Sequence, residues 1–294
     1  MKKILVTGAN GQLGAELQQI AALYPDFRFI FTDSKTLPID QEEKVREAFA
    51  LHQPAYCINC AAYTAVDKAE SEPARAMLVN GTAVGLLAQE AETVGAVLIH
   101  ISSDYVFDGT ALRPLKEDDP VNPLGVYGLS KRKGEELAQL YNPSSIIIRT
   151  SWVYSSYGHN FVKTMLRLMA ERTEINVVND QEGTPTFAAD LAKVILDIIS
   201  FAEQSGNPGS FGGIYHYSND GATTWYEFAS AIKEFSGSKC TVNPIPTSAY
   251  PTPAQRPAYS VFNKEKIRLV FGINTIPWKY SLQSCLLQLQ RYLA

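Results

Sequence analysis

A tyrosine and a lysine four residues apart give the sequence its most specific chemical signal, in Tyr127-Gly128-Leu129-Ser130-Lys131. On a helix this spacing puts Tyr127 and Lys131 on one face. Tyrosine has a reference pKa of about 10, and two close cations in a dry pocket can lower it toward acid–base catalysis near neutral pH. A bare pair of this kind also occurs by chance on protein surfaces, so its position among the other motifs decides its meaning.

A second signal is a run of glycines spaced three residues apart, in Thr7-Gly8-Ala9-Asn10-Gly11-Gln12-Leu13-Gly14. The run follows an apolar stretch and precedes a helical pattern. Gly8 permits a tight turn, Gly11 lets backbone N–H groups approach a pyrophosphate, and Gly14 allows close packing of helix on strand. Taken alone, such a run of glycines occurs by chance in loops as well as in nucleotide-binding motifs. At the first strand-to-helix turn of a sheet it predicts a dinucleotide-binding site.

Two aspartates follow the next apolar run. Asp33 stands 19 residues after Gly14, where a carboxylate can accept hydrogen bonds from the adenosine ribose, or act as a solvated turn or capping residue. A carboxylate there favours NADH by repelling the 2′-phosphate of NADPH, whereas Lys35 offsets that repulsion, so both cofactors remain open. Asp40 either caps the next helix or meets the adenine.

Small and polar residues follow two further apolar runs. Ala61 and Ala62 come after the run ending at Asn59, where small side chains let a cofactor lie against the chain or serve packing. Ser103 and Asp104 come directly after the next run. Their hydroxyl and carboxylate can hold a carbonyl oxygen.

The elements that must position these residues alternate between buried apolar runs and amphipathic segments, which is typical of a parallel sheet wrapped by helices. We expect five strands, at residues 3–7, 27–32, 55–59, 96–101 and 145–150. We expect helices between them at 12–22, 41–51, 73–94 and 126–141. Right-handed crossovers place the carboxyl ends of the strands along one edge, where open α/β sheets bind ligands. The fold class is therefore α/β, with a Rossmann-type doubly wound parallel sheet.

The second half is less regular. Helical patterns occur at 160–170, 188–201, 224–235 and 282–293, with Pro- and Gly-rich segments at 206–213 and 244–257. We expect a smaller C-terminal α/β substrate-binding lobe, with 174–178 as a candidate sixth strand of the sheet. This gives an NAD(P)-binding Rossmann domain of residues 1–152 plus returning segments near 172–202. The substrate-binding lobe then comprises mainly 153–171 and 203–294.

Composition excludes several classes of protein. The 294 residues are 46% hydrophobic and 19% charged, with a net charge of −4 and no basic stripe, so the chain is globular and does not bind nucleic acid non-specifically. The apolar start at residues 4–6 is too short for a signal peptide or a membrane span. Four cysteines are typical of a reduced compartment, and we expect a cytoplasmic protein. Cys57 and Cys60 form a CxxC, but an isolated one in an apolar run favours buried cysteines over a metal or redox site.

The glycine turn followed by Tyr127 and Lys131 resembles the extended short-chain dehydrogenase/reductase family. More narrowly, four segments resemble the dTDP-4-dehydrorhamnose reductase family, at residues 59–70, 102–109, 150–154 and 246–253. The resemblance runs through nearly the whole chain. It implies that NADH or NADPH reduces the C4 ketone of dTDP-6-deoxy-L-lyxo-4-hexulose to dTDP-L-rhamnose, for cell-surface polysaccharide.

The resemblance also implies catalytic roles. Tyr127 is the general acid that protonates the nascent C4 alkoxide, and Lys131 holds the nicotinamide ribose and lowers the pKa of Tyr127. Ser103, a threonine in many relatives, polarises the ketone. The cofactor-binding positions expected from the turn, the strand ends and the resemblance are Gly8, Asn10, Gly11, Gln12, Leu13, Gly14, Asp33, Asp40, Ala61, Ala62, Tyr63, Thr64, Tyr127 and Lys131.

Besides Ser103, we expect five positions to contact the substrate. Asp104 and Trp152 match sugar-pocket positions, although a tryptophan at a strand end also serves as core. Asn160, Lys163 and Arg256 are candidates for the nucleotide diphosphate because an anion needs cationic or amide donors. Each is otherwise a solvated surface residue.

A metal site is doubtful. Some members of the family form a magnesium-linked dimer through glutamates, and Glu16 matches one such position. The later positions are not clearly glutamate, since Ala189 stands beside Asp190 and the last helix reads Leu-Gln-Arg-Tyr. Monomer and homodimer both remain open.

Two other functions share these motifs. A nucleotide-sugar epimerase or dehydratase has the same glycines and Tyr/Lys pair, but a dehydratase is expected to carry Asp-Glu where this chain has Asp104 and Tyr105. A non-catalytic NADP-binding regulatory subunit has the same fold. It has no physical need for the intact set of Ser103, Tyr127 and Lys131.

Overall fold

A six-stranded parallel sheet forms the centre of the computed structural model, which describes residues 1–293. The strand order is β10-β5-β4-β3-β1-β2, and all neighbouring pairs are parallel. The strands are β1 (Lys2–Thr7), β2 (Phe27–Phe31), β3 (Tyr56–Asn59), β4 (Val97–Ser103), β5 (Ile146–Thr150) and β10 (Gly213–His216). Five of them confirm the predicted runs, and the doubly wound α/β class is confirmed.

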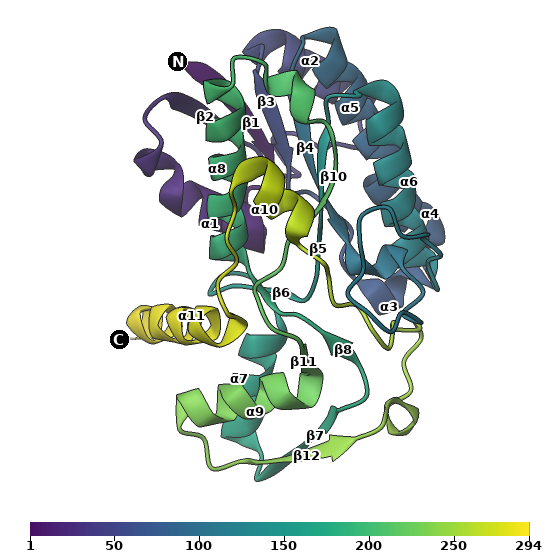
Figure 1. Cartoon of the computed structure of the whole chain (residues 1–294), viewed down its shortest axis with the longest axis vertical. Helices are drawn as coiled ribbons and strands as arrows, with labels where there is room; N and C mark the ends of the chain where they lie inside the picture. The colour runs from purple at the N-terminus through teal and green to yellow at the C-terminus, as the bar shows by residue number, and fades with distance from the viewer. Residues whose placement is uncertain (294) are drawn as a thin grey trace.

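Helices cover both faces of the sheet because its strands are apolar on both sides (Figure 1). On one face α1 (Gln12–Ile20), α8 (Ala188–Gln204) and α10 (Glu265–Phe271) pack on the strands. On the other lie α2 (Glu42–His52) and α5 (Ala83–Thr93), with α6 (Val126–Tyr141) packed against α5. The crossover after β3 also contains α3 (Val66–Ala69), α4 (Pro73–Met77) and a π-helical turn, Leu78–Thr82.

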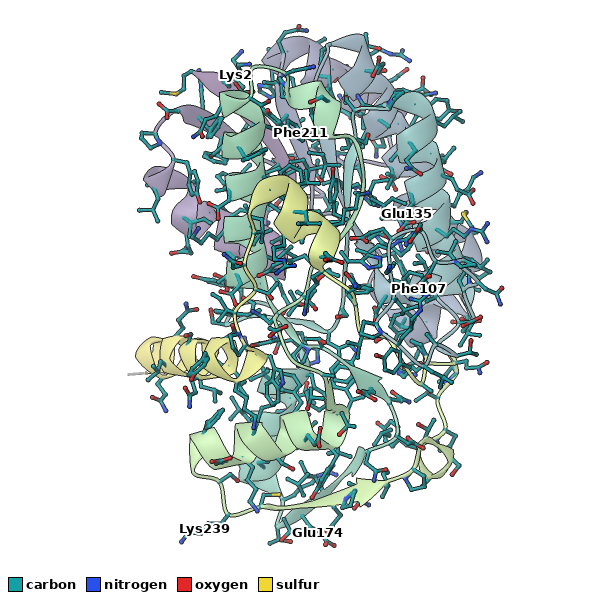
Figure 2. The ribbon with its side chains drawn as sticks, viewed as in Figure 1. Lys2, Phe107, Glu135, Glu174, Phe211 and Lys239 are labelled. Atoms are coloured by element: carbon teal, nitrogen blue, oxygen red, sulfur yellow. The ribbon has the colours of Figure 1, made fainter. Side chains whose placement is uncertain are left out.

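The catalytic helix predicted at 126–141 is α6, Val126–Tyr141. It follows a long loop that begins at the carboxyl end of β4, after the 3-10 turn Asp104–Val106. A buried ion pair fixes the helix to the sheet, with Arg149 of β5 donating to both oxygens of Glu135 at 2.7 and 2.9 Å. The Glu135 and Phe107 side chains lie on the same side of the molecule (Figure 2).

A second core builds the lobe beyond the carboxyl edge of the sheet (Figure 1). It is made by α7 (Phe161–Glu171), α9 (Trp225–Ser236), α11 (Trp278–Leu293) and β7 (Glu174–Val178). Its short strands are β6 (Val153–Tyr154), β8 (Glu182–Gly183), β9 (Thr186–Phe187), β11 (Thr223–Thr224) and β12 (Thr241–Ile245). Lys2 of the sheet lies at one end of the molecule and Glu174 and Lys239 of the lobe at the other (Figure 2).

The expectation that residues 174–178 supply the sixth strand of the sheet is wrong. They form β7, which pairs in parallel with β12 in a separate two-stranded sheet. The sixth strand is β10, which lies beside β5 and begins at the end of the Gly- and Pro-rich segment 206–213. The burial of β7 alternates along the strand, so it has one apolar face, whereas strands inside a two-sided parallel sheet are buried on both. Residues 213–216 and α10 thus pack with the sheet, although both lie between segments of the lobe in sequence.

No helix within residues 1–293 is both long enough and apolar enough to span a membrane.

Candidate active site

The glycine turn brings β1, the end of β3 and the start of α1 into backbone contact. Gly8 has φ +67°, and a Cβ there would lie 2.6 Å from the amide nitrogen of Ala61. A Cβ on Gly14 would lie 2.5 Å from the carbonyl oxygen of Gly8. Gly11 is the N-cap of α1 and no side chain caps the helix, so the first-turn amides are free for an anion. This geometry fits a dinucleotide pyrophosphate.

Asp33 follows β2 and fixes the turn in which it lies. Its Oδ1 accepts from the amides of Lys35 and Thr36 at 3.0 and 2.9 Å, and its Oδ2 accepts from the Asn10 side chain at 2.6 Å. These hydrogen bonds, led by the one from the Thr36 amide, lower the pKa of Asp33. The side chain therefore stays charged and linked to the glycine turn through Asn10.

Asp40 does not cap α2. The N-cap of that helix is Gln41, which makes no side-chain cap, and Asp40 instead pairs with Arg75 at 2.6 Å. The nearby guanidinium attracts the carboxylate away from the helix end. The capping interpretation is wrong at this position.

A buried asparagine, Asn80, holds the segment that follows β3, which contains Ala61 and Ala62. Asn80, in the π-helical turn, accepts from the Tyr63 amide at 2.8 Å and donates to the Tyr63 carbonyl at 2.9 Å. It also donates to Ser130 Oγ at 3.0 Å, and Ser130 donates to the Tyr127 carbonyl. Asn80 thus ties the chain after β3, at Tyr63, to α6. Sequence reasoning missed it, because a polar residue inside a long helical pattern gives no local signal.

Ser103, Tyr127 and Lys131 meet at the carboxyl end of β4. Ser103 is the last residue of β4, and its hydroxyl is hydrogen-bonded to the Tyr127 side chain. The Tyr105 ring packs edge-on against Tyr127 with centroids 5.3 Å apart. Lys131 is 2% exposed, and its Nζ donates to the Ile101 carbonyl at 2.6 Å. The predicted helix therefore places both side chains toward the strand that carries Ser103.

The electrostatics of this group differ from expectation. Burial raises the pKa of Tyr127 to about 12. The hydrogen bond with Ser103 lowers this pKa and the nearby Asp104 raises it, but both effects are smaller than that of burial. Burial lowers the pKa of Lys131 to about 8, opposed by Glu135. The protein by itself does not lower the pKa of Tyr127, because desolvation outweighs its neighbours. Tyr127 is a neutral phenol at physiological pH, the form that a proton donor requires.

Asp104 is a buried carboxylate next to this group, at 1% exposure. Its Oδ1 accepts from Ser103 Oγ at 3.0 Å, while its Oδ2 has no hydrogen-bond partner within the described residues. Burial raises the pKa of Asp104 to about 6, against hydrogen bonds from Ser260 and Ser103. Asp104 is therefore a buried carboxylate that orients the Ser103 hydroxyl, and it does not line the pocket described below.

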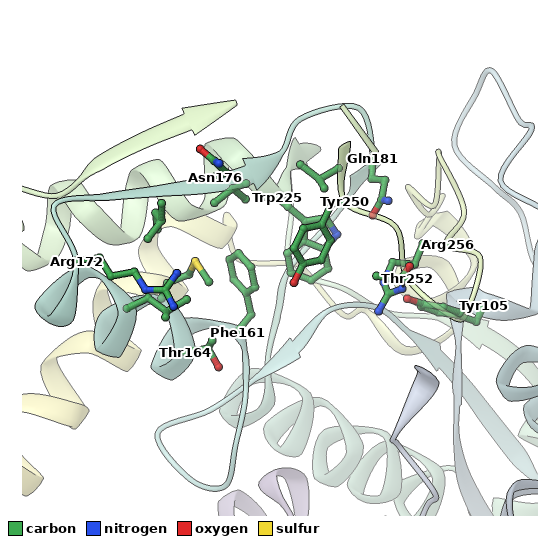
Figure 3. Close-up of a pocket in the computed structure, with 15 residues that line it drawn as sticks. Tyr105, Phe161, Thr164, Arg172, Asn176, Gln181, Trp225, Tyr250, Thr252 and Arg256 are labelled. Atoms are coloured by element: carbon green, nitrogen blue, oxygen red, sulfur yellow. Dashed lines mark hydrogen bonds between the residues drawn. The ribbon is translucent and has the colours of Figure 1, made fainter. Parts of the chain in front are cut away.

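A pocket of about 480 Å³ opens beside the group of Ser103, Tyr127 and Lys131, between α7, β7, the start of α9 and residues 246–257, which we call the strap (Figure 3). Its lining is mainly aromatic and apolar, with a cation at each end. The lining residues are Tyr105, Phe161, Thr164, Met165, Leu168, Arg172, Ile175, Asn176, Val177, Val178, Gln181, Trp225, Tyr250, Thr252 and Arg256. Arg172 and Arg256 lie at opposite ends, and Tyr105 lies beside Arg256 (Figure 3). Because the Tyr105 ring also packs against Tyr127, the pocket lies next to the group of Ser103, Tyr127 and Lys131.

Trp152 does not line this pocket but packs against Trp225, which does. It has φ +48°, and its indole stacks on Trp225 with centroids 3.6 Å apart. A Cβ on Gly183 would lie 2.7 Å from the Trp152 ring. One indole face is therefore covered by Trp225, which itself lines the pocket.

The structure does not bring Asn160 and Lys163 into the pocket. Asn160 is the N-cap of α7, accepting from the Lys163 amide, and its Nδ2 donates to Ser155 O at 2.7 Å and Gln12 Oε1 at 2.9 Å. Lys163 Nζ donates to the Ser156 carbonyl at 3.3 Å. Neither residue lines the pocket, whereas Arg256 does, and the diphosphate contacts expected of Asn160 and Lys163 stay predictions.

Glu16 is buried on α1 and accepts from Ser155 Oγ at 2.6 Å. Burial raises the pKa of Glu16. Across residues 1–293 no group of three or more His, Cys, Asp or Glu side chains is arranged to hold a metal ion.

Comparison with known proteins assigns the chain to a family. The family model described as RmlD substrate binding domain matches residues 1–291. The chain belongs to the RmlD family. The dTDP-4-dehydrorhamnose reductase of Escherichia coli (strain K12) is 42% identical, over 97% of each chain. The spore coat polysaccharide biosynthesis protein SpsK of Bacillus subtilis (strain 168) is also 42% identical over 97% of each.

Solved RmlD-family structures match over the whole fold. The dTDP-4-dehydrorhamnose reductase of Clostridium acetobutylicum has a TM-score of 0.92 and 41% identity, covering 98% of this chain and 99% of that one. The Bacillus anthracis reductase in complex with NADP has a TM-score of 0.91 and 39% identity, covering 98% and 100%. A UDP-glucose 4-epimerase of Thermotoga maritima, 18% identical with a TM-score of 0.82, shares the fold alone.

Proposed function

We propose that this RmlD-family protein reduces the C4 ketone of dTDP-6-deoxy-L-lyxo-4-hexulose to dTDP-L-rhamnose, using NADPH or NADH. The observation that carries the proposal is the meeting of Ser103, at the end of β4, with Tyr127 and Lys131 of α6 at the carboxyl edge of the sheet. It lies between a glycine turn that fits a dinucleotide and a lobe pocket that fits a nucleotide. The reductases named among the relatives, one of them in complex with NADP, support the reaction and the cofactor.

The chain's own residues handle the oxygen of the ketone. A bound nicotinamide cofactor supplies the hydride to C4. Tyr127 donates its phenolic proton to the developing C4 alkoxide, and Ser103 hydrogen-bonds the same oxygen. Lys131 uses one Nζ hydrogen on Ile101, and its two others are free to hold the nicotinamide ribose. Asp104 accepts from Ser103 Oγ at 3.0 Å and so orients that hydroxyl at the strand end; its contact with a sugar hydroxyl stays a prediction.

The lobe pocket takes the nucleotide part of the substrate. Phe161, Trp225 and Tyr250 offer apolar ring surface for a base and its deoxyribose. Arg256, at the end next to Tyr105, meets the diphosphate, and an arginine is suited to planar recognition of phosphate oxygens. We further propose that the protein is cytoplasmic and acts as a monomer or homodimer; its free cysteines are consistent with a reduced compartment.

The test mixes the purified protein with dTDP-6-deoxy-L-lyxo-4-hexulose and follows the oxidation of NADH and NADPH separately. We expect oxidation that requires the keto-sugar and yields dTDP-L-rhamnose. Cofactor binding with no turnover contradicts the proposal and favours the regulatory-subunit reading. Turnover of a different keto-sugar nucleotide alone favours another reductase of the same family.

Replacing Asp33 tests how the cofactor is selected. Asp33→Ala removes the ribose acceptor and the repulsion of a 2′-phosphate, so we expect the KM for NADH to rise about tenfold and that for NADPH to change less than about twofold. Asp33→Asn is the matched control, because an asparagine keeps the turn but loses the charge. Steady-state kinetics with each cofactor measure the effect, and equal losses for both in Asp33→Ala exclude the ribose role.

The pH profile tests the charge of Lys131. Burial lowers its pKa to about 8, so kcat/KM for the keto-sugar is expected to fall as pH rises through about 8 and Lys131 loses its proton. Tyr127, with a pKa of about 12, titrates well above that range. In Lys131→Arg the charge persists, so the alkaline decline should move upward even if the rate is lower. A decline at the same pH in that variant assigns it to another group.

A further inference from the structure

Arg256 is held by an ion pair that joins two segments far apart in the sequence. Its Nη2 donates to Asp67 Oδ2 at 2.8 Å and its Nη1 to Asp67 Oδ1 at 3.1 Å. Asp67 lies on α3, close after Thr64 at the cofactor edge of β3. Arg256 lies at the end of the strap. The pair therefore connects the sheet, at its cofactor side, to the outer wall of the substrate pocket.

The hydrogen-bond count of the guanidinium leaves donors for a ligand. Nη1 also donates to Thr252 Oγ1 and the Ala254 carbonyl. Of the five N–H groups, Nε–H and one Nη2–H therefore have no partner within residues 1–293. Arg256 retains 24% exposure of its side chain and lies at the pocket beside Tyr105 (Figure 3).

The ionised carboxylate of Asp67 fixes the orientation of the Arg256 guanidinium through its hydrogen bonds. It accepts three hydrogen bonds, the third from the Ala254 amide at 3.2 Å. The Arg256 hydrogen bond, the largest influence, lowers the pKa of Asp67, so its carboxylate is ionised at neutral pH. A guanidinium held on one edge by a bidentate carboxylate loses little freedom when its other edge binds an anion.

We propose that Asp67 is a positioning residue for substrate binding, which holds Arg256 with its remaining N–H donors directed at the diphosphate of the nucleotide sugar. The proposal rests on the proposed function, which places the diphosphate at this end of the pocket. Asp67 itself does not touch the substrate. Its effect is on affinity and not on the chemical step.

The strap supplies a matched control, because a second aspartate binds its other end. Asp180 accepts from the Thr247 amide at 2.9 Å and from Thr247 Oγ1 at 2.6 Å. Asp180→Asn loosens the strap without altering a partner of Arg256. If Asp67 only secured the strap, Asp67→Asn and Asp180→Asn would have similar effects.

The experiment measures the Kd for dTDP by titration calorimetry, together with KM and kcat for the keto-sugar. In Asp67→Asn we expect Kd and KM to rise about tenfold, with kcat within about twofold. Asp180→Asn should change Kd less than about twofold. In an Arg256→Ala background Asp67→Asn should have no further effect, because Asp67 acts only through that side chain.

Three outcomes overturn the inference. These are equal losses in Asp67→Asn and Asp180→Asn, additive losses in the Asp67→Asn/Arg256→Ala double variant, and a fall in kcat at unchanged KM. In each case the wild-type protein still binds dTDP and reduces the keto-sugar, so the proposed function stands. A wild-type protein that does not bind dTDP overturns both.

Discussion

Tyr127→Phe is expected to lower kcat at least about 100-fold, because it removes the only phenol hydrogen-bonded to Ser103 within the described residues and leaves the ring in place. The Kd for NADPH should stay within about twofold, since the phenylalanine keeps the packing of the ring against Tyr105. Single-turnover measurement of NADPH oxidation, with cofactor binding measured by fluorescence, separates the two quantities.

Tyr141→Phe on the same helix is the matched control for this prediction. Tyr141 lies at the last turn of α6 and is 37% exposed, remote from Ser103 in the fold. It should react at the wild-type rate. If Tyr127→Phe also retains a near-normal rate, the proton comes from another group and the assigned role of Tyr127 is wrong.

Gly8→Ala is expected to weaken cofactor binding, raising the Kd for NADPH at least about tenfold. A Cβ at this position would lie 2.6 Å from the Ala61 amide nitrogen and 2.7 Å from the Cys60 carbonyl carbon. Backbone atoms cannot rotate away as a side chain does. The turn must therefore separate from β3, which moves the pyrophosphate-binding amides.

Gly95→Ala isolates the part of this effect that comes from backbone strain. Gly95 has φ +70°, close to the +67° of Gly8, but a Cβ there would meet nothing within 4 Å. Both variants carry a left-handed penalty of about 1–2 kcal/mol. Only Gly8→Ala adds a clash, so its Tm should fall further and its NADPH affinity should be lower. Equal behaviour of the two variants would show that strain alone matters and that the turn is not part of the cofactor site.

Local patterns predicted the sheet and the catalytic helix well. The runs that became β1, β3, β4 and β5 are largely buried, while β2 is a half-buried edge strand. The Tyr127 helix was predicted with both ends correct, because its signal lies within a single element. The sixth strand was misplaced, since β10 is only four residues long and follows a Gly- and Pro-rich segment, whereas β7 looked more like a strand. Choosing between them depends on pairing partners, which a single sequence does not contain.

The substrate pocket was the least predictable part of the site. Phe161, Trp225 and Tyr250 come from α7, α9 and the strap, which only the folded lobe brings together. As aromatic residues in helical or Pro-rich segments they carry no signal distinct from core packing. Asn160 and Lys163 were predicted from residue type, but neither lines the pocket: Asn160 caps α7, and Lys163 Nζ donates to the Ser156 carbonyl. Residue type alone does not reveal which donors a fold leaves free.

Isotope transfer tests the central claim, that this chain delivers hydride to C4 while Tyr127 protonates the oxygen. The protein is incubated with dTDP-6-deoxy-L-lyxo-4-hexulose and NADPH deuterated at the transferred position of the nicotinamide, and the product is examined by mass spectrometry and NMR. The account predicts dTDP-L-rhamnose with one deuterium, at C4, from the wild type and almost none from Tyr127→Phe in the same time. Deuterium at another carbon, or no product from a protein that binds both ligands, would contradict it.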